Sequence, residues 1–190
     1  MLIRWAGLAA SGLMCLVLVQ PAVAGDLDLN LNDDAARLTY AWPARGDRLK
    51  LDAGWLHHQD RGDVIHGGLH LVDFASSGPN PVRGGLGGKL FYVDTETTFD
   101  DELVLGVGGF LKYTLPQYNR FSIGGSVYFA PDVLAFGDSD EFVELEARLS
   151  YNVLREGDIY LGARYINIGF DGGGDFTLDN GLHAGIQLRF

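Results

Sequence analysis

The carboxy-terminal segment, residues 183–190, most strongly constrains what this 190-residue chain can fold into. From Leu182 onward, apolar and polar residues alternate up to the terminal Phe190. Because successive strand side chains point to opposite faces, this pattern predicts a strand with one apolar and one polar face. A last strand of this kind is what a membrane β-barrel needs to close on its first strand. The alternative is an amphipathic strand of a soluble sheet that ends in phenylalanine by chance.

The same segment resembles the terminal signal read by the barrel-assembly machinery of Gram-negative outer membranes. In that pattern a polar residue, a glycine and two spaced hydrophobic or aromatic residues end the chain. The corresponding residues here are His183, Gly185, Leu188 and Phe190, with Leu188 aliphatic where an aromatic residue is commoner. We therefore expect the assembly machinery to be a partner of this chain.

Residues 1–24 have the organisation of a secretory signal peptide: a short basic start, an apolar stretch and an A-x-A site ending at Ala24. We expect cleavage between Ala24 and Gly25, which leaves residues 25–190 as a single barrel domain. Cys15 is the only cysteine and lies inside the signal. The exported chain would then have no disulfide, so its stability would come from hydrogen bonding and packing.

Composition narrows the class of protein. The formal net charge of −11 argues against nucleic acid as a partner, and no basic segment suggests attraction to an anionic surface. The 27 glycines and 12% aromatic residues suit many strands and turns better than a helical bundle.

Alternation and turn residues divide the chain after Gly25 into ten expected strands. The number is even, as bacterial barrels require, and most segments approach the length that a tilted strand needs to cross a bilayer. Loss of the first two strands would give eight. The expected strands are 25–31, 35–43, 48–58, 63–73, 83–93, 102–114, 119–130, 140–152, 156–169 and 178–190.

The two faces of these strands differ in charge. One face is apolar and carries no charged residue, whereas the other collects the charges, which predicts a small antiparallel up-and-down barrel with lipid outside and a polar lumen. A soluble sandwich also alternates, but the hairpin order and the two chain ends favour the barrel. The predicted lumen network is Lys50, Asp52, Lys89, Lys112, Arg120, Glu144, Glu146, Arg148, Arg164 and Arg189.

A barrel of eight to ten strands has an interior that side chains largely fill, whereas wide aqueous pores need about 16 strands. Buried charges in that interior must be paired, and such pairs commonly fix register. The sequence therefore predicts a structural or narrow-channel role in the outer membrane, with no cofactor.

The alternative is a membrane-embedded enzyme that hydrolyses or transfers acyl chains of lipid A. Such an enzyme would hold a histidine by an acid beside a nucleophile near the outer rim. His57, His58 and His66 lie near strand ends at that rim, but no serine with a paired acid is adjacent in the sequence pattern. We therefore assign no catalytic residue.

The loops expected on the outer side are acidic. Asp171 and Asp175 flank three glycines and offer oxygen ligands, but they lack the ordered spacing of a calcium loop, so we assign no metal site. Beside lipopolysaccharide, such loops could share bridging divalent cations with lipid phosphates. Outer-membrane lipid and lipopolysaccharide are thus the expected surroundings.

Over its mature region the chain resembles the YfaZ family of outer-membrane proteins. The residues that carry the resemblance are Gly54-Trp55-Leu56-His57-His58 with 60–63 after it, 128–134, Gly162-Ala163-Arg164-Tyr165 and the last strand. The resemblance implies an exported, porin-like small barrel and brings no catalytic residues. Within it, residues 131–134 are expected to form a structured surface patch, or a simple turn fixed by Pro131.

Overall fold

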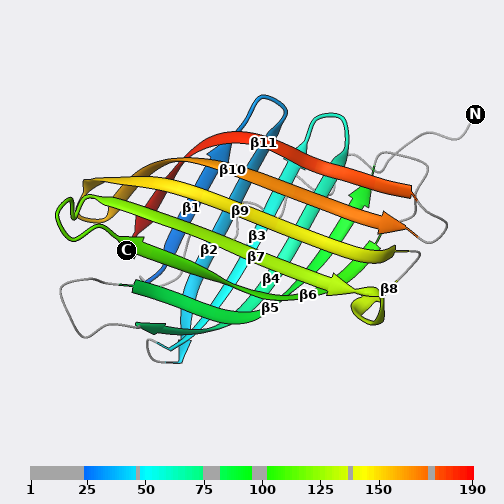
Figure 1. Ribbon diagram of the computed structural model, residues 1–190, viewed down its shortest axis with the longest axis horizontal. Helices are drawn as coiled ribbons and strands as arrows, with labels where there is room; N and C mark the ends of the chain where they lie inside the picture. The colour runs from blue at the N-terminus through cyan, green and yellow to red at the C-terminus, as the bar shows by residue number, and fades with distance from the viewer. Residues whose placement is uncertain (1–23, 46–47, 75–81, 96–101, 137–138, 171–173) are drawn as a thin grey trace, which may run out of the picture.

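A computed structural model describes residues 24–45, 48–74, 82–95, 102–136, 139–170 and 174–190. This part of the chain is an antiparallel sheet that curves around and closes (Figure 1). Its elements are β1 (Asp26–Leu31), β2 (Ala35–Arg45), β3 (Leu49–His58), β4 (Gly62–Phe74), β5 (Val82–Thr95), β6 (Glu102–Thr114), β7 (Phe121–Pro131), the 3-10 helix η2 (Asp132–Leu134), β8 (Ala135–Phe136), β9 (Ser139–Leu154), β10 (Gly157–Phe170) and β11 (Gly174–Arg189).

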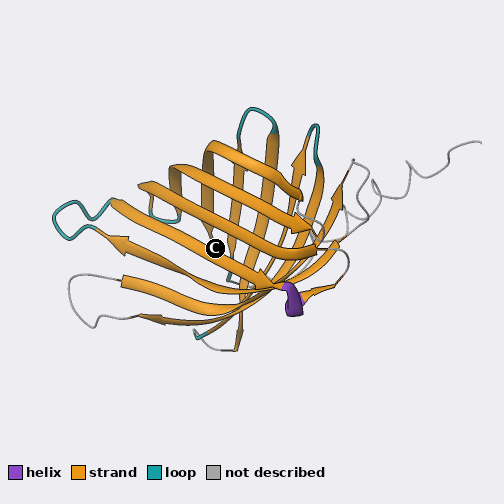
Figure 2. Ribbon diagram, turned by 45° about the vertical axis from the view of Figure 1, so that its right-hand side comes forward, coloured by secondary structure: helices purple, strands orange, loops and turns teal. Residues whose placement is uncertain are grey.

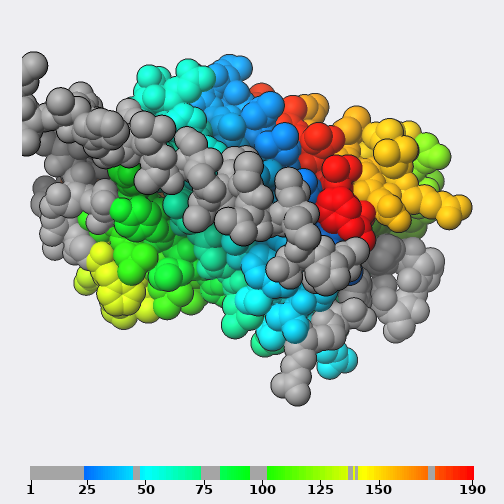
Figure 3. Space-filling view, turned by 180° about the vertical axis from the view of Figure 1, so that it is seen from behind, coloured from blue at the N-terminus to red at the C-terminus, as the bar shows by residue number. Residues whose placement is uncertain are grey.

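Each long strand pairs with the next long strand along the chain, β9 following β7, and β11 pairs with β1 to close the ring. In Figure 3 the blue first strand lies beside the red last strand. The two-residue β8 pairs only with the start of β6. The wall seen in the described residues is therefore a ten-strand up-and-down barrel, which confirms the predicted class and excludes the eight-strand alternative.

The two ends of the barrel differ in what they contain. Asp26 is opposite Arg189 across the closing pair, and the amide of Phe190 donates to the carbonyl of Gly25 at 2.9 Å. We name this end, where β1 begins and β11 ends, the terminal end. The opposite end, which carries η2 and β8, is named the loop end, and the two lie at opposite sides of Figure 1.

Side-chain alternation sorts residues to the two faces of the wall as predicted. On β11, Leu182 and Ile186 are exposed on the outside, whereas His183 between them is buried in the lumen. The outer surface carries exposed leucine, isoleucine, valine and aromatic side chains on every long strand except β2, as a wall facing lipid requires. No helix in the described ranges is long and apolar enough to cross a membrane.

A β-bulge changes the predicted start of the last strand. The register between β10 and β11 shifts between Ile166 and Asn167, so that Leu178 is the extra residue. Both Leu178 and Asp179 are consequently buried in the lumen, although they are adjacent in the chain. The strand begins at Gly174 rather than at residue 178, because the bulge interrupts the alternation from which the boundary was predicted.

The loop-end connections also differ from the predicted ones. The expected strands leave residues 131–139 and 170–177 as connections, but η2 and β8 occupy most of the first, and β11 takes up part of the second. Figure 2 shows η2 as a single turn at the end of β7. Residues 131–134 thus form one ordered turn after Pro131, which fits the expected turn and does not by itself establish a surface patch.

Candidate functional site: the barrel lumen

The loop-end half of the lumen is filled by apolar side chains, which we name the apolar plug. They come from the loop-end portions of eight strands and are all between 0% and 7% exposed. The rings of Phe91 and Phe142 lie 4.5 Å apart between centroids. The plug consists of Leu56, Val64, Phe91, Val93, Val104, Tyr128, Ala130, Phe142, Ile166, Ile168, Phe170 and Leu178.

The prediction of a polar lumen missed this plug. A signal was present in the sequence, because short stretches at the loop end are apolar on both faces, such as Phe91-Tyr92-Val93 and Leu103-Val104-Leu105. Runs without alternation indicate strands buried on both sides. In a barrel wall this means lipid on one side and a packed interior on the other.

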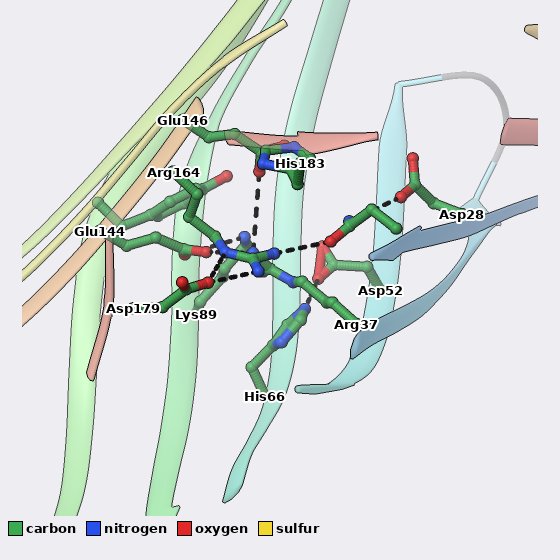
Figure 4. A network of polar contacts seen from close by, with 12 residues as sticks. Asp28, Arg37, Asp52, His66, Lys89, Glu144, Glu146, Arg164, Asp179 and His183 are labelled. Carbon is green, nitrogen blue, oxygen red and sulfur yellow. Dashed lines mark hydrogen bonds and ion pairs between the residues drawn. The ribbon is translucent and has the colours of Figure 1, made fainter. Parts of the chain in front are cut away.

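Next to the plug lies a layer of buried charges, shown in Figure 4. The guanidinium of Arg37 donates to the Glu144 carboxylate at 2.6 Å and lies 3.8 Å from Glu146. The ammonium group of Lys89 is 3.4 Å from the other Glu144 oxygen. Glu144 thus balances two cations from β2 and β5, so it joins opposite parts of the wall through the centre of the barrel.

A second buried pair belongs to the bulge. Arg164 donates from Nε to Asp179 at 2.6 Å and from Nη1 to the side-chain oxygen of Asn30 at 2.9 Å. Asn32, in the turn after β1, donates to the other oxygen of Asp179 at 3.0 Å. The bulge therefore turns Asp179 inward and ties β11 to the first strand.

A chain of hydrogen bonds connects the charges to the plug. The Asp52 carboxylate is 3.0 Å from Nδ1 of His70, and Nε2 of His70 is 2.8 Å from the hydroxyl of Tyr128. His66 lies 3.5 Å from the second Asp52 oxygen. The ammonium group of Lys89 sits 4.1 Å from the centre of the Tyr128 ring, a cation–π distance.

Toward the terminal end, Arg148 occupies the centre of a further cluster. It donates to Asp28 at 2.7 Å, contacts Glu146, and lies 4.5 Å from the centre of the Tyr160 ring. Tyr160 donates its hydroxyl to Asp28 at 2.6 Å. His183, from the last strand, is 3.3 Å from Glu146. The cluster therefore joins β1, β9, β10 and β11.

At the terminal rim, the Asp158 carboxylate holds three donors. Lys112 lies at 2.9 Å, Arg189 at 2.6 and 3.1 Å, and the Asn152 amide at 2.6 Å. Lys50 pairs with Asp26 beside them. This rim layer connects β6 to β11 across the opening.

Arg120 is the predicted network residue that the structure places elsewhere. It is exposed in the turn before β7, where its guanidinium is 3.4 Å from the Tyr151 hydroxyl. The prediction extended that strand to residue 119, but β7 starts at Phe121. The other predicted network residues all make the lumen contacts described above.

The predicted network lacked several charged residues that the structure places in it, among them Arg37, Asp158 and Asp179. Arg37 and Asp158 lie at inward positions of alternating strands, so strict alternation would have found both. Asp179 lies next to Leu178, and the bulge that turns both inward has no local sequence signal.

Glycines opposite lumen rings make room for the network. Gly162 is directly opposite His183, and a Cβ there would lie 2.5 Å from the imidazole Nε2. Gly54 is opposite His66 in the same way, and Gly185 is opposite Tyr160. In each pair the ring covers the bare backbone of its neighbour, which is a known device for stabilising glycine in sheets.

The three histidines considered for catalysis do not form one site. His57 is on the outer face, where its Nδ1 is 2.8 Å from Asp63, and Asp63 also accepts from the Trp55 indole at 3.0 Å. His58 and His66 are buried on the lumen side. Within the described residues, no hydroxyl of serine or threonine is bonded to any of these histidines.

Of the two weak metal candidates, Asp171 lies outside the described residues and Asp175 is exposed at the start of β11. No group of three or more histidine, cysteine or carboxylate side chains suited to a metal occurs in the described ranges. The residues proposed as an assembly signal divide between the faces: His183 is buried, whereas Leu188 and Phe190 are exposed on the outside.

A closed ten-strand wall, apolar outside and with a buried network of charges inside, defines a small porin-like β-barrel. The sequence profile of a family described as "YfaZ precursor" matches residues 3–190, and the chain belongs to this family. The protein is accordingly an outer-membrane β-barrel of Gram-negative bacteria.

Individual relatives were also found. Outer membrane protein YfaZ of Escherichia coli (strain K12) is 29% identical over 186 residues, covering 96% of this chain and 98% of that protein. Among solved structures, the KdgM porin has a TM-score of 0.46 and 13% identity, covering 88% of this chain and 99% of its own. The KdgM porin in complex with disordered oligogalacturonate has a TM-score of 0.45 at the same identity and coverage.

Proposed function

We propose that this protein is a structural barrel of the outer membrane whose lumen does not conduct in the conformation described. The apolar plug is the observation that supports this proposal, because its side chains are almost completely buried across the loop-end half of the lumen. A dry apolar constriction excludes ions even without a complete steric block. The narrow-channel role would require the plug to move.

Planar-bilayer conductance of the refolded protein tests the proposal. We expect no steady current from the wild type, and a measurable current from the double variant Phe91→Ala/Phe142→Ala, because it removes two contacting rings of the plug. The control is Phe121→Ala/Phe129→Ala, which removes two exposed outer-face rings. A steady wild-type current would refute the proposal. A folded plug variant that stays silent would show that the plug is not what closes the lumen.

The geometry does not support the lipid-modifying alternative. Of the three histidines considered, only His57 faces outward, and its Nδ1 is within hydrogen-bond distance of the Asp63 carboxylate. Lipid A profiles of cells that overproduce the protein test this reading, and we expect them to be unchanged.

For delivery, we propose cleavage between Ala24 and Gly25 and recognition of the last strand by the barrel-assembly machinery. Gly25 already bonds to Phe190 in the closing pair, which supports a mature chain that begins there. Amino-terminal sequencing of the envelope protein tests the cleavage. Deletion of Phe190 should lower the heat-modifiable fraction in the membrane, and an unchanged fraction would contradict the signal.

At the loop end we propose that acidic residues share divalent cations with lipopolysaccharide phosphates. Asp33, Asp34 and Asp60 support this, because they lie in exposed connections there. EDTA should lower the melting midpoint in lipopolysaccharide-containing membranes but not in detergent alone. A melting midpoint that EDTA leaves unchanged in lipopolysaccharide-containing membranes would contradict the proposal.

A further inference from the structure

The terminal half of the lumen contains a cavity of about 220 Å³, which borders the apolar plug at Tyr128. Its lining includes small residues of β7, seven cationic side chains and four carboxylates. The cations include Lys50, Lys112, Arg148 and Arg189, and the carboxylates are Asp26, Asp28, Asp52 and Glu146. The whole chain carries a formal charge of −11, so a cavity lining with an excess of cations is unusual within it.

The ion pairs around this cavity are arranged asymmetrically. At the rim, the side chains of Lys112 and Arg189 are 31% and 30% exposed, whereas that of their shared partner Asp158 is only 5% exposed. Arg148 is 27% exposed, whereas its partner Asp28 is 8% exposed. In these pairs the cation is the more exposed partner, so the excess of cations over carboxylates in the lining is what an entering solute meets.

The cavity has a hollow between two of these cations. Gly124 on β7 is paired with Lys112 on β6 and with Arg148 on β9, so the three residues form one row across adjacent strands. Because the middle residue has no side chain, the two cations flank an open space. Ser126, two residues further along β7, also lines the cavity and offers a hydroxyl.

From this geometry we infer that the cavity is a binding site for a small oxyanion, a carboxylate or phosphate group held between Lys112 and Arg148. Ammonium and guanidinium groups both donate charge-assisted hydrogen bonds to such oxygens. Low-dielectric walls around a cavity of one sign focus its field on an entering solute. The site goes beyond the structural role and does not require the plug to open.

Isothermal titration of the refolded barrel in detergent with inorganic phosphate, and separately with citrate, tests this inference. We expect saturable binding of at least one anion and none of glucose, a neutral solute. Lys112→Gln should weaken binding about tenfold, the effect of losing one charge-assisted hydrogen bond. This variant keeps Arg189 and Asn152 on Asp158, so the carboxylate retains partners.

Two further variants keep the test decisive. Ser126→Asp retains every cation but adds a negative charge inside the cavity, and should abolish binding. Arg120→Gln removes a cation from the exposed turn and should leave binding unchanged. Heat-modifiable migration must first show that each variant is folded.

Binding of phosphate alone or of citrate alone would support the inference and identify the preferred oxyanion. No binding of either anion to the folded wild type, or equal weakening in Lys112→Gln and Arg120→Gln, would overturn the inference.

Discussion

The same ten-strand wall encloses both halves of the lumen, but its interior positions hold different kinds of side chain in each half. At the loop end, interior positions hold side chains such as Phe91, Phe142 and Leu178, all nearly inaccessible to water. At the terminal end, equivalent interior positions hold Lys112, Arg148 and Arg189, each about a quarter to a third exposed. Between the two halves lies the fully buried pair of Arg37 and Glu144.

The comparison shows that hydration, rather than charge alone, separates the halves. Asp158 and Glu144 each hold two cations, but the cations of Asp158 reach water, whereas those of Glu144 lie against the plug. A charge in contact with water costs little to leave without its partner, and a buried one costs much. The same type of contact should therefore have different effects at the two depths.

The largest expected effect comes from Glu144→Ala. It leaves Arg37 and Lys89 without their shared carboxylate in the driest polar layer. We expect a loss in the free energy of unfolding toward the upper end of about 3–5 kcal/mol, the range for breaking a buried pair. Urea titration of the barrel refolded into lipid vesicles measures it. A loss smaller than that of Lys112→Gln at the terminal rim would remove the distinction between the two depths.

The plug should give the next effect. Phe142→Ala removes a fully buried ring that packs against Phe91, and we expect a loss in the free energy of unfolding of about 3 kcal/mol. The matched control is Phe129→Ala, which removes an exposed ring from the outer face beside it. If both variants lose the same stability in the same titration, the loop-end interior is not packed as a core.

A smaller effect is expected where a ring covers a glycine. Gly162→Ala places a Cβ 2.5 Å from the imidazole Nε2 of His183 and 2.8 Å from the backbone oxygen of Ala147, so the ring and the neighbouring strand must shift. Overpacking of this kind costs about 1–3 kcal/mol. Gly174→Ala serves as the control, because its Cβ would meet nothing within 4 Å. Chemical denaturation of both variants should separate them, and equal midpoints would show that the ring moves freely.

The smallest effect should come from Lys112→Gln in the hydrated layer. Asp158 keeps Arg189 and Asn152, and Lys112 is already partly in water. We expect a change of less than about 1 kcal/mol, as for exposed ion pairs. The same denaturation series measures it, at low and at high salt. A loss as large as that of Glu144→Ala would mean that the terminal half is as dry as the centre.

Much of the wall could be predicted from the sequence, because strand alternation is a local property. The boundaries of β6 matched the prediction at both ends, and those of β7 and β10 lay within two residues. The start of β11 was missed because one extra residue at Leu178 resets the alternation. Arg120 was misplaced because a one-strand pattern does not show where pairing stops.

The sequence could predict which side chains face the lumen, but not how they pair with one another there. Alternation sent Lys112, Glu144 and Arg148 to the lumen, yet it could not show which pairs lie in water. Apolar residues face lipid and also form the plug, so residue type alone did not distinguish the outside from the loop-end interior. The cavity likewise depends on Gly124, whose open side appears only when its two neighbouring strands are in register.

The sequence by itself determined the strands, their two faces and the closing role of the last strand, because a period of two residues assigns each side chain to a face. Only the tertiary structure decided the partners across the barrel. Arg37 and Glu144 are 107 residues apart and meet because the ring closes and its curvature brings opposite walls within side-chain reach. Closure of the ring also determined how deeply each interior side chain is buried. It therefore determined which half of the lumen is dry and which can admit a solute.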